Sequence, residues 1–161
     1  MNADSAHKSG WAIAEVVFGV PFLLSSVPQF LVPISFPQII PSQALLFIGI
    51  VLIIIGIAVI VAARRELARY RQPTDPGQPT SQVVKTGIFA VSRNPLYLGS
   101  VVFLGGVALL LNSLWALAAL LLSLMLCHYV LIAPEEKYLQ AKFGAEYAEY
   151  IAAVRRWVGR S

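Results

Sequence analysis

Residues 86–100 read TGIFAVSRNPLYLGS, and this stretch decides how the rest of the chain is interpreted. It joins a polar, basic segment to an apolar run. Asn94 suits the N-cap of a helix, and Pro95 suits the first helical position, where no backbone N–H is needed. Such a helix start presents free N–H groups and the positive end of the helix dipole, and Arg93 adds a permanent charge. We therefore predict an anion-binding corner where this helix begins.

The composition is that of a membrane protein. The 161 residues are 58% hydrophobic and only 12% charged, whereas soluble domains carry about 25% charged residues. The single Cys excludes a disulfide framework, and two His cannot build a zinc site by themselves. The net charge of +4 comes from residues beside apolar runs, which fits membrane topology better than nucleic acid. We expect neither a metal nor a nucleic-acid partner.

Four apolar stretches predict membrane-crossing helices, which need about 20 residues each. They cover residues 11–30, 44–63, 95–111 and 114–133. The expected fold is an all-α integral membrane protein, a single domain over 1–161. Residues 1–63 would hold two transmembrane helices, 64–94 a cytoplasmic loop, 95–133 a transmembrane hairpin and 134–161 an interfacial, amphipathic tail.

The distribution of charge predicts the orientation. Residues 64–94 carry six basic and two acidic side chains, while the connection 31–43 carries no charge. By the positive-inside rule the basic loop and both termini are cytoplasmic, and the short loops suit a prokaryotic inner membrane. The simpler interpretation of Arg64 and Arg65 is topology and contact with anionic lipid. Glu15 lies about one turn inside the first span, where it either serves function or reaches the headgroups.

The last part of the chain follows a helical pattern. Pro134 is expected to end the fourth span, and Glu135 and Glu136 would complement the dipole of a new helix. Gly144 should divide this segment into two short helices. Apolar and aromatic residues at helical spacing indicate an interfacial face that covers the mouth of the hairpin. His128 lies one heptad before Glu135 on the same helix face, either hydrogen-bonded as structure or acting as a catalyst.

Cationic, acidic and aromatic side chains thus gather on the cytoplasmic face. Carboxylates bind an ammonium or a ribose, arginine binds a carboxylate, and aromatic rings stack on a base or face a cation. The set suits a zwitterionic ligand with a flat ring. The sequence has no phosphate-binding glycine loop and no metal-ligand spacing.

The runs GIFAVSRNPLYLGS (87–100) and EEKYLQAKFGAEYAEYIAAVRRW (135–157) resemble a family of membrane-embedded methyltransferases. This family includes isoprenylcysteine carboxyl methyltransferases and phospholipid N-methyltransferases. Its pattern is a Gly-aromatic element, Arg-(His or Asn)-Pro-x-Tyr, a Glu-Glu pair and Phe-Gly-x-x-Tyr-x-x-Tyr before basic and aromatic residues. All four parts occur in order. Asn94 stands where the carboxyl methyltransferases usually have His. Asn is found in phospholipid-type relatives, which weakens the case for isoprenylcysteine as the substrate.

The resemblance implies S-adenosylmethionine as cofactor, bound at the cytoplasmic ends of the hairpin, and a lipid or lipid-like methyl acceptor. The cofactor-binding residues it implies are Arg93, Asn94, Tyr97, Gly99, Glu135, Glu136, Tyr147, Tyr150 and Arg155. A carboxylate acceptor would need no general base. An amine acceptor would need one, for which the candidates are His128, Glu135 and Glu136. The identity of the acceptor, and O- against N-methylation, stay open.

The alternative is a non-enzymatic four-helix membrane protein, such as a small transporter or an assembly subunit. A transporter should carry polar or ionisable groups near mid-membrane. The middles of the last three spans have none. An enzyme that uses a cytosolic cofactor is therefore the favoured interpretation.

Overall fold

The computed structural model describes residues 14–74 and 79–160. Within these ranges every regular element is a helix, apart from one isolated antiparallel bridge between Val154 and Arg160. Its α-helices are α1 (Val20–Leu24), α2 (Ser26–Leu31), α3 (Ser42–Arg69), α4 (Pro95–Leu110), α5 (Leu114–Leu126), α6 (Ala133–Phe143) and α7 (Ala145–Ala153). Two π-helical segments, Glu15–Gly19 and Cys127–Ile132, and a 3-10 turn, Gly87–Ala90, complete the set.

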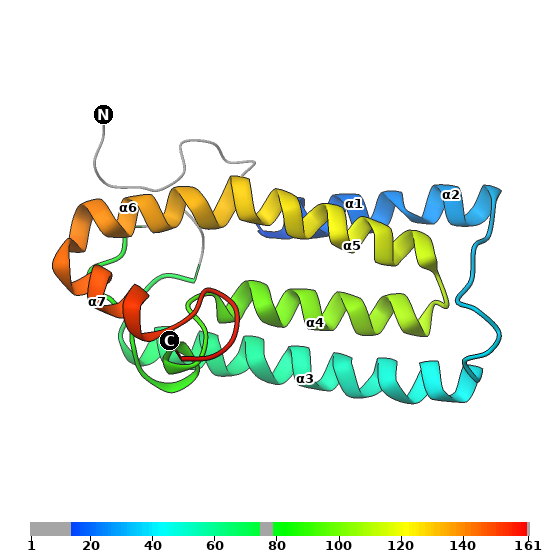
Figure 1. Ribbon diagram of the computed structural model, residues 1–161, viewed down its shortest axis with the longest axis horizontal. Helices are drawn as coiled ribbons and strands as arrows, with labels where there is room; N and C mark the ends of the chain where they lie inside the picture. The colour runs from blue at the N-terminus through cyan, green and yellow to red at the C-terminus, as the bar shows by residue number, and fades with distance from the viewer. Residues whose placement is uncertain (1–13, 75–78, 161) are drawn as a thin grey trace.

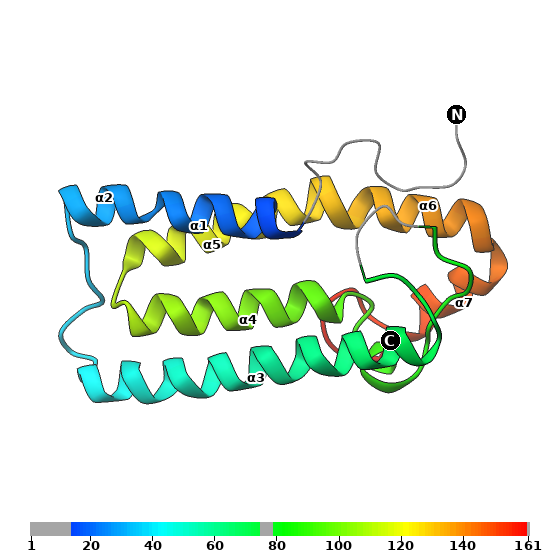
Figure 2. The same ribbon diagram turned by 180° about the vertical axis from the view of Figure 1, so that it is seen from behind.

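The first row of helices is broken, as its prolines predict. It runs from the Glu15–Gly19 segment through α1 and α2 and lies along α5 (Figures 1 and 2). Pro28 has no N–H to bond the carbonyl four residues earlier, and its ring crowds that carbonyl. The helix accordingly breaks at Ser25, between α1 and α2. Residues 11–13 of the predicted span lie outside the described residues.

Helices α3 and α4 lie side by side with their backbones in contact (Figure 1). A Cβ placed on Gly56 would lie 2.6 Å from the Phe103 backbone nitrogen. A Cβ on Gly99 would lie 2.6 Å from Ile60 Cγ1 and 3.0 Å from the Gly56 carbonyl oxygen. Small residues permit this close approach of apolar helices. Gly99 therefore makes room for α3, and a close approach of the cofactor at this glycine stays a prediction.

Two predicted helix ends are corrected. Helix α3 continues to Arg69, so residues 64–69 are helical and the loop begins only afterwards. Pro134 does not end the fourth helix, because α5, the π-helical turn and α6 form one continuous rod, Leu114–Phe143. Pro134 directly follows the π-helical turn, where the regular i to i−4 hydrogen bonding is already interrupted.

The two turns that the sequence predicts are confirmed. Between α4 and α5, Ser113 Oγ accepts a hydrogen bond from the Ala116 N–H at 3.1 Å and so caps α5. At the other end, Gly144 has a φ of +51° and separates α6 from α7. That left-handed conformation suits glycine. It lets α7 fold back beside the end of the rod (Figure 1).

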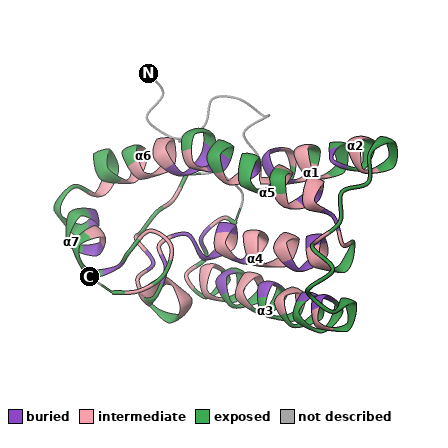
Figure 3. Ribbon diagram, turned by 45° about the vertical axis from the view of Figure 1, so that its right-hand side comes forward, coloured by how far each residue is buried: buried purple, intermediate pink, exposed green. Residues whose placement is uncertain are grey.

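Two helices are long and apolar enough to cross a membrane, α3 and the rod Leu114–Phe143. The helical stretches Glu15–Leu31 and Pro95–Leu110 are apolar but shorter. The exposed surface of the bundle carries large apolar side chains, with Phe30 88% and Phe47 69% exposed (Figure 3). Such a surface suits contact with lipid. Four crossings and the cytoplasmic position of the tail stay predictions.

The length of the rod indicates where its acidic end lies relative to the hydrocarbon layer of a membrane. Thirty residues of helix cover about 45 Å, whereas the hydrocarbon layer of a bilayer is about 30 Å thick. The apolar part of the rod ends near Ala133, and Glu135 and Glu136 follow. We therefore place these two carboxylates outside the membrane-spanning segment.

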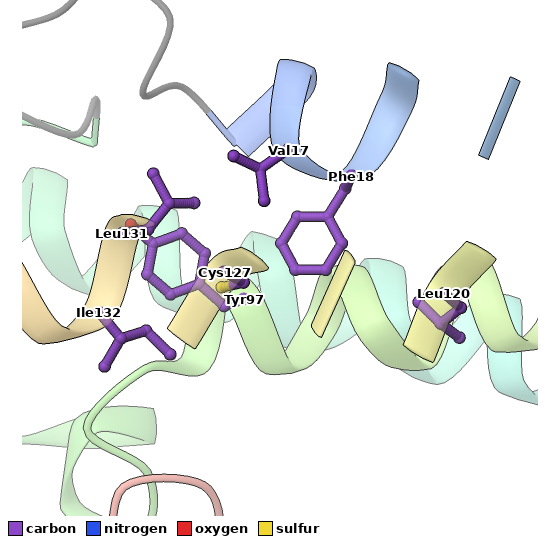
Figure 4. Packing of buried hydrophobic residues seen from close by; sticks show 7 residues of the cluster. All are labelled: Val17, Phe18, Tyr97, Leu120, Cys127, Leu131 and Ile132. Atoms are coloured by element: carbon purple, nitrogen blue, oxygen red, sulfur yellow. The ribbon is translucent and has the colours of Figure 1, made fainter. Parts of the chain in front are cut away.

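A buried apolar cluster holds this end of the bundle together (Figure 4). Val17 and Phe18 reach it from the first helical row and Tyr97 from α4. The rod contributes Leu120, Cys127, Leu131 and Ile132. The cluster fixes the start of α4 against the rod, so the Tyr97 hydroxyl and the carboxylates of α6 come together.

Candidate functional site

Two arginines bind Glu136. Arg93 Nη1 lies 2.9 Å from Glu136 Oε1, and the Arg93 side chain is only 9% exposed. Arg156 donates from Nε to Oε1 at 3.0 Å and from Nη2 to Oε2 at 2.7 Å. These hydrogen bonds to the carboxylate raise the pKa of Arg156. Both oxygens of Glu136 are thus occupied by arginine nitrogens, so this carboxylate holds the two arginine side chains in place.

The tail 154–160 ties this ion cluster to the start of α4. Asn94 occupies the N-cap position and Pro95 the first turn, as predicted. The Asn94 side chain makes no capping bond, however, and Nδ2 donates instead to the Arg156 carbonyl at 3.1 Å. The Arg93 backbone N–H donates to the Arg155 carbonyl at 3.2 Å. The tail therefore holds the Arg93–Asn94 corner in place.

The second carboxylate, Glu135, contacts a different partner. The Tyr97 hydroxyl donates to Glu135 Oε2 at 3.2 Å. Burial raises the pKa of Glu135 to about 7, with the hydrogen bond from Tyr97 opposing the shift and the charge of Glu136 adding to it. Glu135 therefore titrates near neutral pH, as a proton acceptor in an enzyme often does.

A cavity of about 210 Å³ lies beside these groups, where α3, α4, α6, α7 and the loop between α3 and α4 meet. Six of the predicted cofactor residues line it: Arg93, Asn94, Tyr97, Glu135, Tyr147 and Tyr150. Arg93 Nε is buried and finds no hydrogen-bond partner among the described residues. A donor of this kind on the cavity wall is available to an acceptor group of a ligand.

Two tyrosines of α7 form the aromatic part of the wall. Their rings lie 6.1 Å apart at 57°, and the Tyr150 hydroxyl donates to the Phe89 carbonyl at 2.7 Å. Burial raises the pKa of Tyr147 to about 12 and also raises that of Tyr150. Both hydroxyls therefore stay protonated near neutral pH and act as hydrogen-bond donors.

Four predicted site residues do not line the cavity: Gly99, Glu136, Arg155 and His128. Arg155 is exposed, whereas its neighbour Arg156 contacts Glu136. His128 Nδ1 lies 3.4 Å from Arg156 Nη1, and His128 does not line the cavity. Of the three candidates for a general base, only Glu135 reaches the cavity.

Sequence reasoning missed several wall residues. Glu15 was noted as an intramembrane carboxylate and Arg64 as a topology signal, and both line the cavity. Gln72, Thr80, Gln82 and Tyr138 also line it. Gln72, Thr80 and Gln82 come from the connection after α3, whose path no helical pattern indicates. Tyr138 lies on α6 three residues after Glu135, so helical spacing could have placed it on the same face.

Among the described residues, no group of three or more His, Cys, Asp or Glu side chains is arranged to hold a metal ion. The fold and the cavity thus define an all-helical membrane protein with a mixed-charge, tyrosine-lined site beside its apolar bundle. A family model described as phospholipid methyltransferase matches residues 44–146, more than half of the chain. The chain belongs to this family, and it is a methyltransferase of phospholipids. No curated protein and no solved structure matched it.

Proposed function

We propose that the protein transfers a methyl group from S-adenosylmethionine to a phospholipid, with the cofactor in the cavity between α3, α4, α6 and α7. The observation that carries this proposal is the meeting of an unpaired arginine donor, a titratable carboxylate and two tyrosines on one wall. The cofactor has a carboxylate, an ammonium and a flat adenine ring. The residues present fit all three groups.

The roles follow from the contacts. Arg93 would bind the cofactor carboxylate through its free Nε, and Glu135 would bind the ammonium or take a proton from the acceptor. Tyr147 and Tyr150 would cover the ring and exclude water. Glu136 and Arg156 would keep the Arg93 side chain in place.

S-adenosylmethionine supplies a methyl group that is already activated as a sulfonium. The protein has to align donor and acceptor and keep water out. The cavity lies at the end of the apolar bundle, with wall residues from both the apolar helices and the polar segments, so a water-soluble cofactor and a membrane lipid can both reach it. We propose that this is the cytoplasmic face of a prokaryotic inner membrane, as the basic residues of 64–94 indicate.

The test is calorimetric titration of the detergent-purified chain with S-adenosylmethionine, followed by transfer of radiolabelled methyl into a total lipid extract. Arg93→Ala and Glu135→Ala should each weaken cofactor binding about tenfold or more, since a hydrogen bond to a charged group contributes about 1.5–3 kcal/mol. Arg69→Ala is the matched control, because this arginine ends α3 without lining the cavity. Absence of binding, or equal binding by all variants, refutes the proposal.

A further inference from the structure

One face of α3 lines the cavity, and this face carries one charged residue. Ile60, Arg64 and Leu67 all line the wall, at the i, i+4 and i+7 spacing of one helix face. Arg65, one position further along, does not. Arg64 directly follows the apolar run 44–63, so its charge lies at the boundary of the hydrocarbon layer, where lipid phosphates are found.

A carboxylate reaches the same cavity from the opposite side. Glu15 begins the first helical row and lines the wall. This row and α3 lie on either side of α4 (Figure 2). Between them α4 contributes the uncharged residues Leu96 and Ser100 to the wall. The cavity is therefore flanked by a carboxylate on one side and a guanidinium on the other.

These two charged side chains lack the partners that Arg93 and Glu135 have. Arg93 is paired with Glu136, and Glu135 accepts a hydrogen bond from Tyr97. Within residues 14–74 and 79–160, neither Glu15 nor Arg64 has an ion-pair partner, and they do not pair with one another. A ligand that carries both an anion and a cation can satisfy both.

We propose that Arg64 and Glu15 are the residues that select the lipid acceptor. Arg64 binds the phosphate and Glu15 the ammonium of a zwitterionic aminophospholipid headgroup. An aminophospholipid acceptor is what membership of the phospholipid methyltransferase family already implies, and the inference is that these two residues recognise its headgroup. The inference rests on the proposed function and adds two residues to it, one of which, Glu15, lies outside the matched region 44–146.

The test measures methyl transfer to dioleoylphosphatidylethanolamine in mixed micelles, with the full chain and radiolabelled S-adenosylmethionine. Arg64→Ala and Glu15→Gln should each raise the KM for this lipid about tenfold, which corresponds to about 1.4 kcal/mol. Arg65→Ala, the neighbouring arginine that does not line the cavity, should change it less than twofold. Arg64→Lys should restore most of the loss, because a phosphate also binds a point charge.

Two further measurements separate the roles. Calorimetry should give the same Kd for S-adenosylmethionine in wild type, Arg64→Ala and Glu15→Gln. Phosphatidylglycerol has the phosphate without the ammonium, so its inhibition should weaken in Arg64→Ala and stay unchanged in Glu15→Gln. This comparison stays informative if one variant folds poorly, since the other and Arg64→Lys remain measurable.

The outcomes are distinguishable. Equal KM values for Arg64→Ala and Arg65→Ala, or cofactor binding weakened as much as lipid binding, overturn the assignment and leave the proposed function standing. A wild-type chain that binds the cofactor and methylates other lipids but not phosphatidylethanolamine also overturns it. A wild-type chain that binds no cofactor refutes the proposed function itself.

Discussion

Two adjacent glycines of α4 provide a sharp test of the packing between α3 and α4. A Cβ on Gly106 would lie 2.6 Å from the Gly49 carbonyl oxygen and 2.9 Å from the Ile53 backbone nitrogen. A Cβ on Gly105 would lie 3.6 Å from Leu120 Cδ2, an ordinary contact. Gly106→Ala should therefore push the two helices apart, whereas Gly105→Ala should fit without movement.

The size of the effect follows from the geometry. An ordinary contact begins at 3.4 Å, so α3 must withdraw by about 0.8 Å at Gly106. A gap of 0.5–1 Å forfeits about a quarter to a half of the dispersion energy of the facing atoms, and overpacking costs about 1–3 kcal/mol. The gain in helix propensity, about 0.5–1 kcal/mol, is shared by both alanine variants and cancels between them.

We expect Gly106→Ala to be less stable than Gly105→Ala by about 1–3 kcal/mol. The assay is reversible unfolding of the purified chain in mixed micelles with increasing denaturing detergent, followed by circular dichroism. Equal stability of the two variants, or a more stable Gly106→Ala, would refute the close backbone contact between α3 and α4.

Three further predictions concern the site. Arg156→Ala removes two hydrogen bonds to Glu136 and should weaken S-adenosylmethionine binding about tenfold, whereas calorimetry of the exposed Arg155→Ala should match wild type. Methyl transfer should rise with pH through about 7, because the raised pKa of Glu135 leaves this carboxyl protonated below that value. Tyr97→Phe removes the hydrogen bond that lowers this pKa and should move the midpoint of the pH–rate profile upward; an unchanged or lower midpoint contradicts the assignment. Methyl transfer should persist after treatment with a chelator, which tests the expectation that no metal takes part.

The sequence predicted the meeting of the Arg93 region with the two acids, and the structure has both contacts. Arg93 lies 2.9 Å from Glu136, and Tyr97 lies 3.2 Å from Glu135. This part was predictable because the helix starts, the hairpin turn and the spacing along each helix are local properties. The division of the tail at Gly144 was predictable for the same reason.

Some features of the site were not predictable from the sequence, because they depend on non-helical segments or on how the helices pack. The resemblance implied Arg155, whereas Arg156 is the arginine that contacts Glu136, and α7 ends at Ala153 before the tail turns back through an extended bridge. Helical phase says nothing about such a segment. The packing of Gly99 against α3 was not predicted, because a glycine that admits a helix and one that admits a ligand look alike in sequence.

The continuous rod Leu114–Phe143 carries both a long apolar segment and the acidic pair of the site, so the position of one follows the position of the other. Its apolar part is anchored in lipid tails, and the acidic pair is rigidly attached to its end. A thinner or thicker membrane changes the tilt of such a rod at a cost of fractions of a kcal/mol per ångström. The depth of the acids relative to the headgroups therefore follows bilayer thickness. Membrane lipids thus act on this protein twice, as the molecules it modifies and as the medium that positions its acidic pair.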